Sequence, residues 1–435
     1  MGIKVINEEN INSMVSEDNT GKSGSKFGVG LIAGIFAGIV VSVIVSIIVV
    51  NLYTGMTGNY LVIGKGQASV SSSSDVLDEK TVSKVEELAK YIDIYFNDEY
   101  TTADIQNGLL EGVMEGLGDP YSVYYNKEKY EDLKLSTTGT YYGIGAGLSQ
   151  NTDTMVVTIS KVYKGTPAEE AGLMTGDKLV TVGDIDATSM EVSELVTHIR
   201  GKEGTKVHLK VYRESSDEYL EFDVERKNIE LPSVEGEMLE NNIGYIQISE
   251  FQTNTAAQFE KILADLEKKG MNGLIVDVRS NPGGLLTSVV DILDDLLPEG
   301  TLVYTEDKYG EKEVYSSDAN CVDFPMVVLV NENSASASEI FAGAIKDYEY
   351  GTLVGKKTFG KGIVQSIITL EDGDALKITT AKYFTPKGNY IHGVGITPDV
   401  ELDYEYSGDK EKPYEKQYDN QLQKAIEIMN QKLSD

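Results

Sequence analysis

The chain has 435 residues, of which 41% are hydrophobic and 25% charged, and a formal net charge of −32. This length allows two or three domains with a sizeable core, and the acidity argues against partners such as nucleic acid or an anionic lipid surface. The single cysteine, Cys321, excludes an intrachain disulfide framework, and no zinc-ligand spacing occurs. We therefore expect a globular protein without a metal or other cofactor.

An uncharged, mostly apolar run covers residues 27–53. About 20 apolar residues suffice to cross a hydrocarbon core, and this run is longer than the apolar region of a cleaved secretory signal. Lys22 and Lys26 precede it, so the positive-inside rule places residues 1–26 in the cytoplasm. The sequence predicts a single-pass plasma-membrane protein with an anchor at 27–53, a flexible Gly/Ser-rich linker at 54–75 and the rest of the chain outside the cytoplasm.

Apolar residues at helical spacing return between residues 76 and 136, and Gly118-Asp119-Pro120 interrupts them. Helices of this length cannot bury a large core of their own, so we expect this segment to pack against a neighbouring domain or a second subunit. The apolar positions are Val82, Val85, Leu88, Ile92, Ile105, Leu109, Val113 and Leu117.

Residues 137–228 contain glycine motifs in a distinctive order. Gly143-Ile144-Gly145 precedes a strand predicted at 155–159, Gly165-Thr166-Pro167 and Gly176-Asp177 follow it, and a helix near 192–199 leads into a strand at 206–213. This order resembles a PDZ domain of the bacterial protease type, a small β-barrel-like fold with two helices. The resemblance implies that a peptide C-terminus docks as an added strand, its carboxylate bound by the backbone of Gly143, Ile144 and Gly145. A Gly-x-Gly taken alone would only form a turn.

Predicted strands and helices alternate between residues 229 and 405, which indicates an α/β core with right-handed crossovers. Two strands, at 273–279 and 326–330, read as buried on both faces. The first ends in Asn281-Pro282-Gly283-Gly284, and the second is followed by Ser334-Ala335-Ser336-Ala337-Ser338 at the start of a helix. Phe359-Gly360-Lys361-Gly362 precedes a further strand at 363–370. Residues 406–435 form a C-terminal tail, with a helix predicted at 414–433.

These motifs, with Gly395-Ile396-Thr397-Pro398-Asp399, closely resemble the carboxyl-terminal processing peptidases, or tail-specific proteases, over residues 76–405. The resemblance implies a serine endopeptidase in which Ser336 is the nucleophile, Lys361 its general base and Gln365 the support of the base. It further implies an oxyanion hole in which the Gly283-Gly284 turn, preferably through Gly284, joins the Ala337 amide. Arg200 is a candidate sensor in the PDZ domain. A homodimer is expected by the same analogy, with 76–136 and the C-terminal helix as subunit contacts.

The chemistry agrees with these residue types. A serine hydroxyl needs a neighbouring base to become nucleophilic, and a lysine acts as a base near neutral pH only when burial lowers its pKa. We expect Gly360 and Gly362 to let the backbone fold tightly enough to turn Lys361 inward. The Gln365 amide would orient the amine without adding a charge that raises its pKa. The backbone N–H of Ala337, at the helix N-terminus, suits an oxyanion donor.

Simpler readings compete with each assignment. Ser336-x-x-Glu339 fits a capping box, so Ser336 would only cap its helix. Ser334 and Ser338 are rival nucleophiles, and His392 would serve a Ser-His mechanism. At the level of the whole protein, the alternative to a peptidase acting on proteins with free C-termini is a catalytically silent, membrane-tethered PDZ scaffold. A third class is an esterase that ignores polypeptides.

Overall fold

The computed structural model describes residues 76–434 apart from residue 153 and residues 410–411. The predicted cytoplasmic segment, anchor and linker lie outside the described residues. Among the described residues, no helix has the length and apolar character needed to cross a membrane. The chain divides into two compact units, Met1–Glu99 and Tyr100–Asp435.

In the first unit the described structure contains helix α2 (Glu79–Tyr95). It begins at Asp78, whose carboxylate accepts a hydrogen bond from the Thr81 amide (2.7 Å) and so satisfies one of the free N–H groups of the first turn. None of its residues is buried, and Leu88, Tyr91 and Ile94 are exposed. The apolar residues from which this helix was predicted therefore do not pack into a core within the described part of its unit.

The second unit begins with α3 (Thr102–Glu115), β1 (Val123–Tyr125) and α4 (Lys127–Thr138). Thr101 and Asp104 form a capping box that starts α3. The predicted interruption at Gly118-Asp119-Pro120 lies in the loop between α3 and β1. Helical spacing gave no indication of β1, because three residues are too few for a strand pattern, and the strand exists by pairing with a distant one, β18 (Ala375–Phe384).

Residues 140–230 form a small β-domain with two sheets. In the larger sheet the strands lie in the order β3-β4-β5-β7-β8, and the short β6 pairs with β5. The smaller sheet consists of β2 and β9. Its core contains Ile159, Leu179, Leu195 and Leu209. The predicted helix at 192–199 and strand at 206–213 are confirmed, and the strand expected at 155–159 runs from Val157 to Val162. The elements are β2 (Thr140–Gly143), β3 (Ala146–Gln150), β4 (Val157–Val162), α5 (Pro167–Ala171), β5 (Lys178–Val182), β6 (Ile185–Asp186), α6 (Val192–Ile199), β7 (Lys206–Arg213), β8 (Glu218–Glu225) and β9 (Lys227–Glu230).

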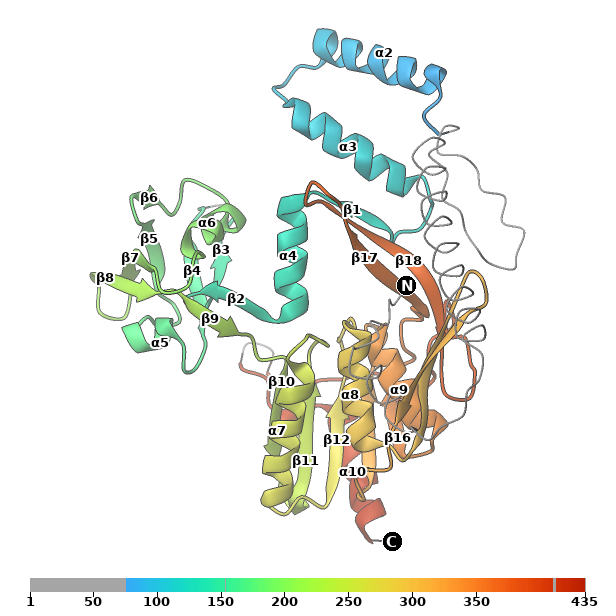
Figure 1. The fold of residues 1–435 in the computed structure, drawn as a ribbon. Coiled ribbons are helices and arrows are strands. Elements are labelled where there is room, and N and C mark those ends of the chain that lie inside the picture. The colour runs from blue at the N-terminus through green and yellow to red at the C-terminus, as the bar shows by residue number, and fades with distance from the viewer. Residues whose placement is uncertain (1–75, 153, 410–411, 435) are drawn as a thin grey trace, which may run out of the picture. The chain divides into compact units, whose positions relative to one another are not determined.

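The predicted α/β core is confirmed as a six-stranded sheet in the order β10-β11-β12-β15-β16-β19, parallel except for β10. Crossover helices join its parallel strands, and α7 and α8 lie side by side (Figure 1). The elements are β10 (Val234–Met238), β11 (Ile243–Ile248), α7 (Thr255–Lys268), β12 (Gly273–Asp277), α8 (Leu286–Leu296), β15 (Met326–Val330), α9 (Ala337–Asp347), β16 (Gly351–Gly355), β19 (Val400–Glu401) and α10 (Asn420–Ser434).

Strand alternation divides the core into two hydrophobic layers. Met326, Val328 and Val330 of β15 belong to the cluster that contains residues of α7, α8 and α9. Val327 and Leu329 belong to a second cluster, with Leu422, Ala425 and Met429 of α10. The sheet is therefore covered on one face by α7–α9 and on the other by α10. The predicted tail helix starts at Asn420, and its apolar face packs on its own sheet. The subunit contact expected for this helix stays a prediction.

A second sheet has β18 at its centre. β1 and β13 (Gly300–Asp307) pair with different parts of β18, and β17 (Ile363–Thr369) pairs along most of its length; β14 (Lys312–Ser317) extends the sheet from β13. The strands at 363–370 and 375–384 were predicted, but the sheet that they form together with β1 and β13 was not. This sheet brings residues near 120 and 377 close to the turn that carries Lys361.

Candidate active site

Ser336 lies at the junction between the buried strand β15 and helix α9. Its backbone has φ 56° and ψ −114°, a conformation that is strained for a residue with a side chain. Such a sharp strand-to-helix turn exposes a nucleophile above a sheet. Ser336 and Glu339 stand in the capping-box arrangement, but the Ser336 side chain makes no cap hydrogen bond. The contact that forms runs from the Ser336 amide to the Glu339 carboxylate (3.0 Å).

The three serines of the run have different surroundings. Ser334 and Ser338 are completely buried, and their hydroxyls donate to the backbone carbonyls of Val278 (2.7 Å) and Asn281 (2.9 Å). Ser336 lies between them and lines an open cavity of about 570 Å³. The geometry therefore leaves Ser336 as the serine of this run that a substrate can reach.

The buried Glu339 carboxylate joins the nucleophile turn to the lysine turn. Besides the Ser336 amide, it accepts hydrogen bonds from the amides of Gly360 (2.7 Å) and Lys361 (2.8 Å) and from the Thr358 hydroxyl (2.6 Å). A buried carboxylate is tolerated only when its oxygens are satisfied in this way. The capping-box pattern predicted the first of these contacts and gave no sign of the others.

Lys361 enters the same cavity because its turn is pressed against residues 392–395. Gly360 has φ +91°, and a Cβ there would lie 3.0 Å from the Gly395 nitrogen. A Cβ on Gly362 would lie 2.6 Å from the His392 nitrogen. The expectation that these two glycines allow the tight turn is confirmed. His392 itself is exposed, and its Nδ1 accepts a hydrogen bond from the Gly362 amide (3.4 Å), which supports the turn rather than a Ser-His mechanism.

The ammonium of Lys361 lies over the ring of Tyr121, 4.7 Å from its centre. Burial is the main cause that lowers the pKa of Lys361, and the nearby charge of Lys377 lowers it further, while Asp119 and Glu339 act in the opposite direction. Among the described residues, Lys361 Nζ donates no hydrogen bond to the Ser336 hydroxyl. The structure therefore provides a lysine whose pKa is lowered, in the same cavity as Ser336 and held on an aromatic face.

Gln365 also lines the cavity, but its observed contact is with another residue. Its Nε2 donates to Thr379 Oγ1 (3.3 Å), and Thr379 donates to the Asp119 carboxylate (2.6 Å). Ser122 donates to the same carboxylate (2.6 Å). Although burial opposes it, these hydrogen bonds hold the pKa of Asp119 below its usual range. Among the described residues, no hydrogen bond joins Gln365 to Lys361, so the expected direct contact is replaced by a chain of side chains that ends at Asp119.

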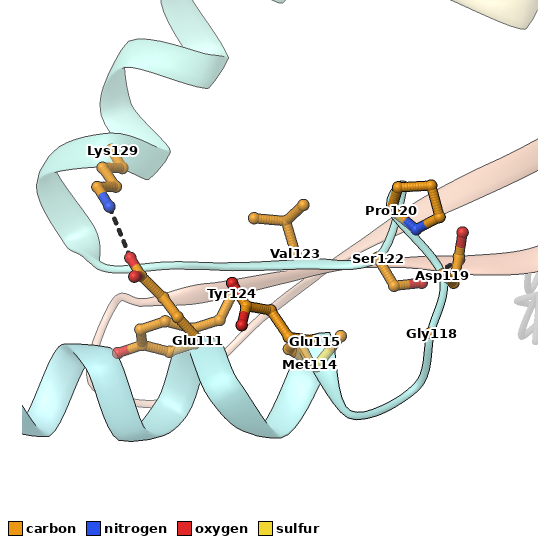
Figure 2. A pocket seen from close by; sticks show the side chains of 10 residues that line it. All are labelled: Glu111, Met114, Glu115, Gly118, Asp119, Pro120, Ser122, Val123, Tyr124 and Lys129. Carbon is orange, nitrogen blue, oxygen red and sulfur yellow. Dashed lines mark hydrogen bonds and ion pairs between the residues drawn. The ribbon is translucent and has the colours of Figure 1, made fainter.

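The loop that provides Asp119 and Tyr121 is the break between α3 and β1. Figure 2 shows Asp119, Pro120 and Ser122 on this loop, beside a surface pocket of about 540 Å³. At the other end of the pocket Glu111 forms an ion pair with Lys129 (2.6 Å). Sequence reasoning treated this loop as an interruption, and the one available signal was the rigid Asp-Pro pair at a helix end.

The Gly283-Gly284 turn faces the nucleophile. A Cβ on Gly283 would lie 2.7 Å from Ser336 Cβ and 2.9 Å from the Ala337 nitrogen. The Gly283 amide donates to the Asn281 side chain (2.8 Å). Gly284 forms an isolated parallel bridge with Phe251, in which the hydrogen bonds use the Gly283 carbonyl and the Leu285 amide. The Gly284 N–H is therefore directed away from that bridge. Both glycines and Ala337 line the cavity.

The predicted peptide site of the small β-domain lies beside a groove of about 570 Å³. The groove is mainly apolar and includes Ile144, Leu148 and Val196, whereas Gly143 pairs with Lys227 and Gly145 adopts φ +80°. The predicted sensor Arg200 lines the groove, 3.8 Å from Asp132 of α4 and over the ring of Tyr141. Ile144 and Arg200 thus border one groove.

An α/β core that presents Ser336 and the half-buried Lys361 in one cavity, joined to a small β-domain with an apolar groove, is the arrangement expected of a serine peptidase. The chain matches the peptidase family S41 over residues 242–402 and the PDZ domain over 158–213. It is 38% identical over 295 residues to a carboxyl-terminal-processing protease of Synechocystis sp., covering 67% of this chain and 69% of that protein. It is 35% identical over 353 residues to the carboxy-terminal processing protease CtpA of Bacillus subtilis, covering 80% and 73%.

Among solved structures, a photosystem II D1 C-terminal processing protease aligns with 73% of this chain and 86% of its own, at 29% identity and a TM-score of 0.43. The protein belongs to the carboxyl-terminal processing proteases of peptidase family S41, which are serine proteases. The family and the PDZ domain predicted from the sequence motifs are confirmed.

Proposed function

We propose that the protein is a membrane-anchored endopeptidase in which Ser336 and Lys361 form a catalytic dyad. The observation that carries this proposal is a single cavity lined by Ser336, Lys361, Gln365, Ala337 and Gly284, all of them predicted from the sequence. The burial of Ser334 and Ser338 and the exposure of His392 count against their rival roles. Neither a metal nor a nucleotide is needed for this chemistry.

The reaction begins with Lys361 as the neutral amine, which leaves the Tyr121 ring and accepts the proton of the Ser336 hydroxyl at Nζ. Ser336 Oγ then attacks the peptide carbonyl carbon, and the carbonyl oxygen takes up the negative charge. The Ala337 and Gly284 amides donate to this oxyanion. The protonated Lys361 gives its proton to the leaving nitrogen as the C–N bond breaks. Water, deprotonated by Lys361, hydrolyses the acyl-enzyme ester and releases Ser336 with its proton restored.

Gln365 holds the base in place in this proposal. When the lysine turns from Tyr121 towards Ser336, the amide oxygen of Gln365 accepts a hydrogen bond from its amine, while Nε2 stays bound to Thr379. A neutral partner suits a base that must lose its proton, because a carboxylate in contact would favour the ammonium form and raise the pKa.

Substrate selection is assigned to the PDZ domain. A protein C-terminus adds as a strand beside Leu148, and its carboxylate binds the backbone at Gly143, Ile144 and Gly145. Arg200 serves as the sensor of the bound peptide, since it borders the groove and approaches Asp132. Occupation of the groove would disturb this ion pair and so affect α4, whose residues Leu133 and Ser136 line the catalytic cavity.

Residues 27–53 anchor the protein in the plasma membrane, with residues 1–26 in the cytoplasm and the peptidase outside. The length of the uncharged run and the lysines before it support this arrangement. A homodimer formed through the segment before the PDZ domain is consistent with the exposed apolar residues of α2 and α3, among them Leu88, Tyr91 and Leu109.

The test compares the full chain with S336A on an unfolded protein substrate. Loss of the nucleophile should reduce kcat by on the order of 10⁵-fold or more, with a change in the free energy of unfolding of at most about 1 kcal/mol. S338A is the matched control: it loses a buried hydrogen bond and should unfold more easily, yet cleave. Retained proteolysis by S336A would reject the assignment. No proteolysis by the wild type would favour the scaffold, and cleavage of small esters alone would favour the esterase.

A further inference from the structure

The catalytic cavity contains a second lysine that the proposed mechanism does not use. Its lining residues in the described chain include two cations, Lys361 and Lys377, and one carboxylate, Glu250. For a protein with a net charge of −32, a cavity whose lysines at least equal its carboxylates in number departs from the acidity of the whole chain. Lys361 must lose its proton to act as a base, whereas nothing in the proposed mechanism requires Lys377 to do so.

Lys377 lies on β18 with no acid opposite it. Its neighbours in register are Val123 on β1 and Ile367 on β17, both apolar. Tyr383 lies further along β18, beyond a register shift in the pairing with β17, and also lines the cavity. The side chain of Lys377 is thus built into the cavity wall by its strand.

Lys377 Nζ has no hydrogen bond or ion pair with any described residue. Other lysines of the same unit have partners: Lys346 pairs with Asp399 (2.9 Å), Lys356 with Glu401 (3.5 Å), and Lys382 lies over the Tyr390 ring (5.4 Å). Burial lowers the pKa of Lys377, as it does for a cation that has lost part of its hydration. An unpaired, partly desolvated ammonium gains most from an anion that enters its site.

We propose that Lys377 binds a carboxylate of the substrate peptide inside the catalytic cavity. The carboxylate comes either from the C-terminus of the peptide or from an Asp or Glu side chain close to the scissile bond. This inference rests on the proposed function, in which the peptide lies beside Ser336. It gives the peptidase a second point of selection for negative charge, separate from the PDZ groove.

The experiment measures kcat/KM of the full chain on matched fluorogenic peptides. One pair has the same sequence with a free C-terminal carboxylate or a carboxamide; a second pair has Asp or Asn beside the cleaved bond and a carboxamide end. In one of the two pairs, K377M should lower the acid-to-neutral ratio of kcat/KM by about 10-fold, since a hydrogen bond to a charged group stabilises by about 1.5–3 kcal/mol. The pair that responds identifies the source of the carboxylate.

Controls separate this role from that of the PDZ domain and from misfolding. K377M leaves the PDZ groove unchanged, so a fall in the acid-to-neutral ratio of kcat/KM in this variant reflects the loss of Lys377. K377R should restore the ratio, and K382M, on the same strand, should keep it. If K377M unfolds below the assay temperature, K377Q provides the same comparison. An acid-to-neutral ratio within about twofold of wild type in both pairs would overturn the proposal. Loss of a hydrogen bond to a charged group should change kcat/KM by more than about twofold.

A failure of the catalytic dyad would look different. If the wild type cleaves none of the peptides, the proposed function fails, and the same four peptides are titrated against S336A and against the double variant S336A/K377M. A selective loss of affinity for the carboxylate peptides in the double variant still supports Lys377 as an anion site. Equal affinities in both proteins reject it.

Discussion

The two walls of the catalytic cavity are built differently. The nucleophile wall consists of Ser336, the start of α9 and the Gly283-Gly284 turn; the base wall consists of β17, β18 and the loop 118–122. In the nucleophile wall Ser334, Ser338 and Glu339 are completely buried, and each makes at least one hydrogen bond of 3.0 Å or less. In the base wall the Lys361 ammonium contacts a ring, and Ile367 and Ile368 of β17 are exposed.

This difference indicates that Ser336, the proposed nucleophile, is held by the core, whereas the position of Lys361, the proposed base, depends on parts that are distant in the chain. Ser336 is held by Glu339 in its own helix, faces the Gly283 turn, and accepts at its carbonyl a hydrogen bond from the Tyr383 hydroxyl of β18 (3.1 Å). Lys361 is surrounded by Tyr121, Asp119 and Lys377. The Glu339 carboxylate, which binds both turns, connects the two walls. Three substitutions test this comparison.

The largest effect is expected for the base itself. K361M should lower kcat by about 10³-fold or more, because general base catalysis contributes about 10²–10⁴-fold and the serine is otherwise unactivated. K361R should be equally inactive, since a guanidinium stays protonated.

In the wild type, kcat/KM should rise with pH along a limb whose midpoint lies below 10.5, because burial lowers the pKa of Lys361. A K361R enzyme with nearly normal kcat would reject Lys361 as the base.

The same pKa has a consequence for stability. Because burial lowers the pKa of Lys361 in the folded protein, the unfolded chain binds this proton more tightly. Stability therefore increases as pH rises from the folded-state pKa to the unfolded value, and at lower pH the cost of burying this group opposes folding. K361M should be at least as stable as wild type at pH 7 by urea denaturation. A clearly less stable variant would mean that Lys361 holds the base wall together.

An intermediate effect is expected for the connection between the walls. E339Q places an amide NH₂ group among three N–H donors and a hydroxyl, so at least one buried donor loses its acceptor. We expect the free energy of unfolding to fall by about 1–3 kcal/mol and kcat to fall by about 10–100-fold, as expected for misplaced catalytic groups. E332Q, on the exposed turn before the nucleophile, is the matched control and should change neither quantity. Normal kcat in a destabilised E339Q would show that the walls align without this carboxylate.

The smallest effect is expected for the support of Gln365. T379V removes the hydroxyl that receives the Gln365 amide and donates to Asp119. We expect kcat to fall by about 10-fold with little change in KM, as for loss of an interaction made in the transition state. T380V, the next residue on β18, loses the exposed contact with Ser366 and is the matched control. Equal kcat in T379V and T380V would remove Asp119 and Thr379 from the site.

The sequence by itself determined the identity of the family and the α/β core, and it predicted the proposed catalytic residues of the nucleophile wall. Ser336, Ala337 and Gly284 lie in motifs that also specify their local backbone: a buried strand, a turn and a helix start. The glycines around Lys361 likewise predicted a tight turn. Local chemistry and local conformation coincide at these positions, so spacing along the chain was sufficient to find them.

Tertiary structure alone decided the surroundings of the base. Lys377 lines the cavity, and Tyr121 and Asp119 come close to Lys361, because β1 and β17 pair with β18. Such pairing leaves no periodic signal in a three-residue strand. Glu339 was recognised as a helix-cap residue, but its contacts with the lysine turn required the fold. The physical reason is that the basicity of Lys361 depends on burial and on neighbouring charges, and these are set by residues far from it in the sequence.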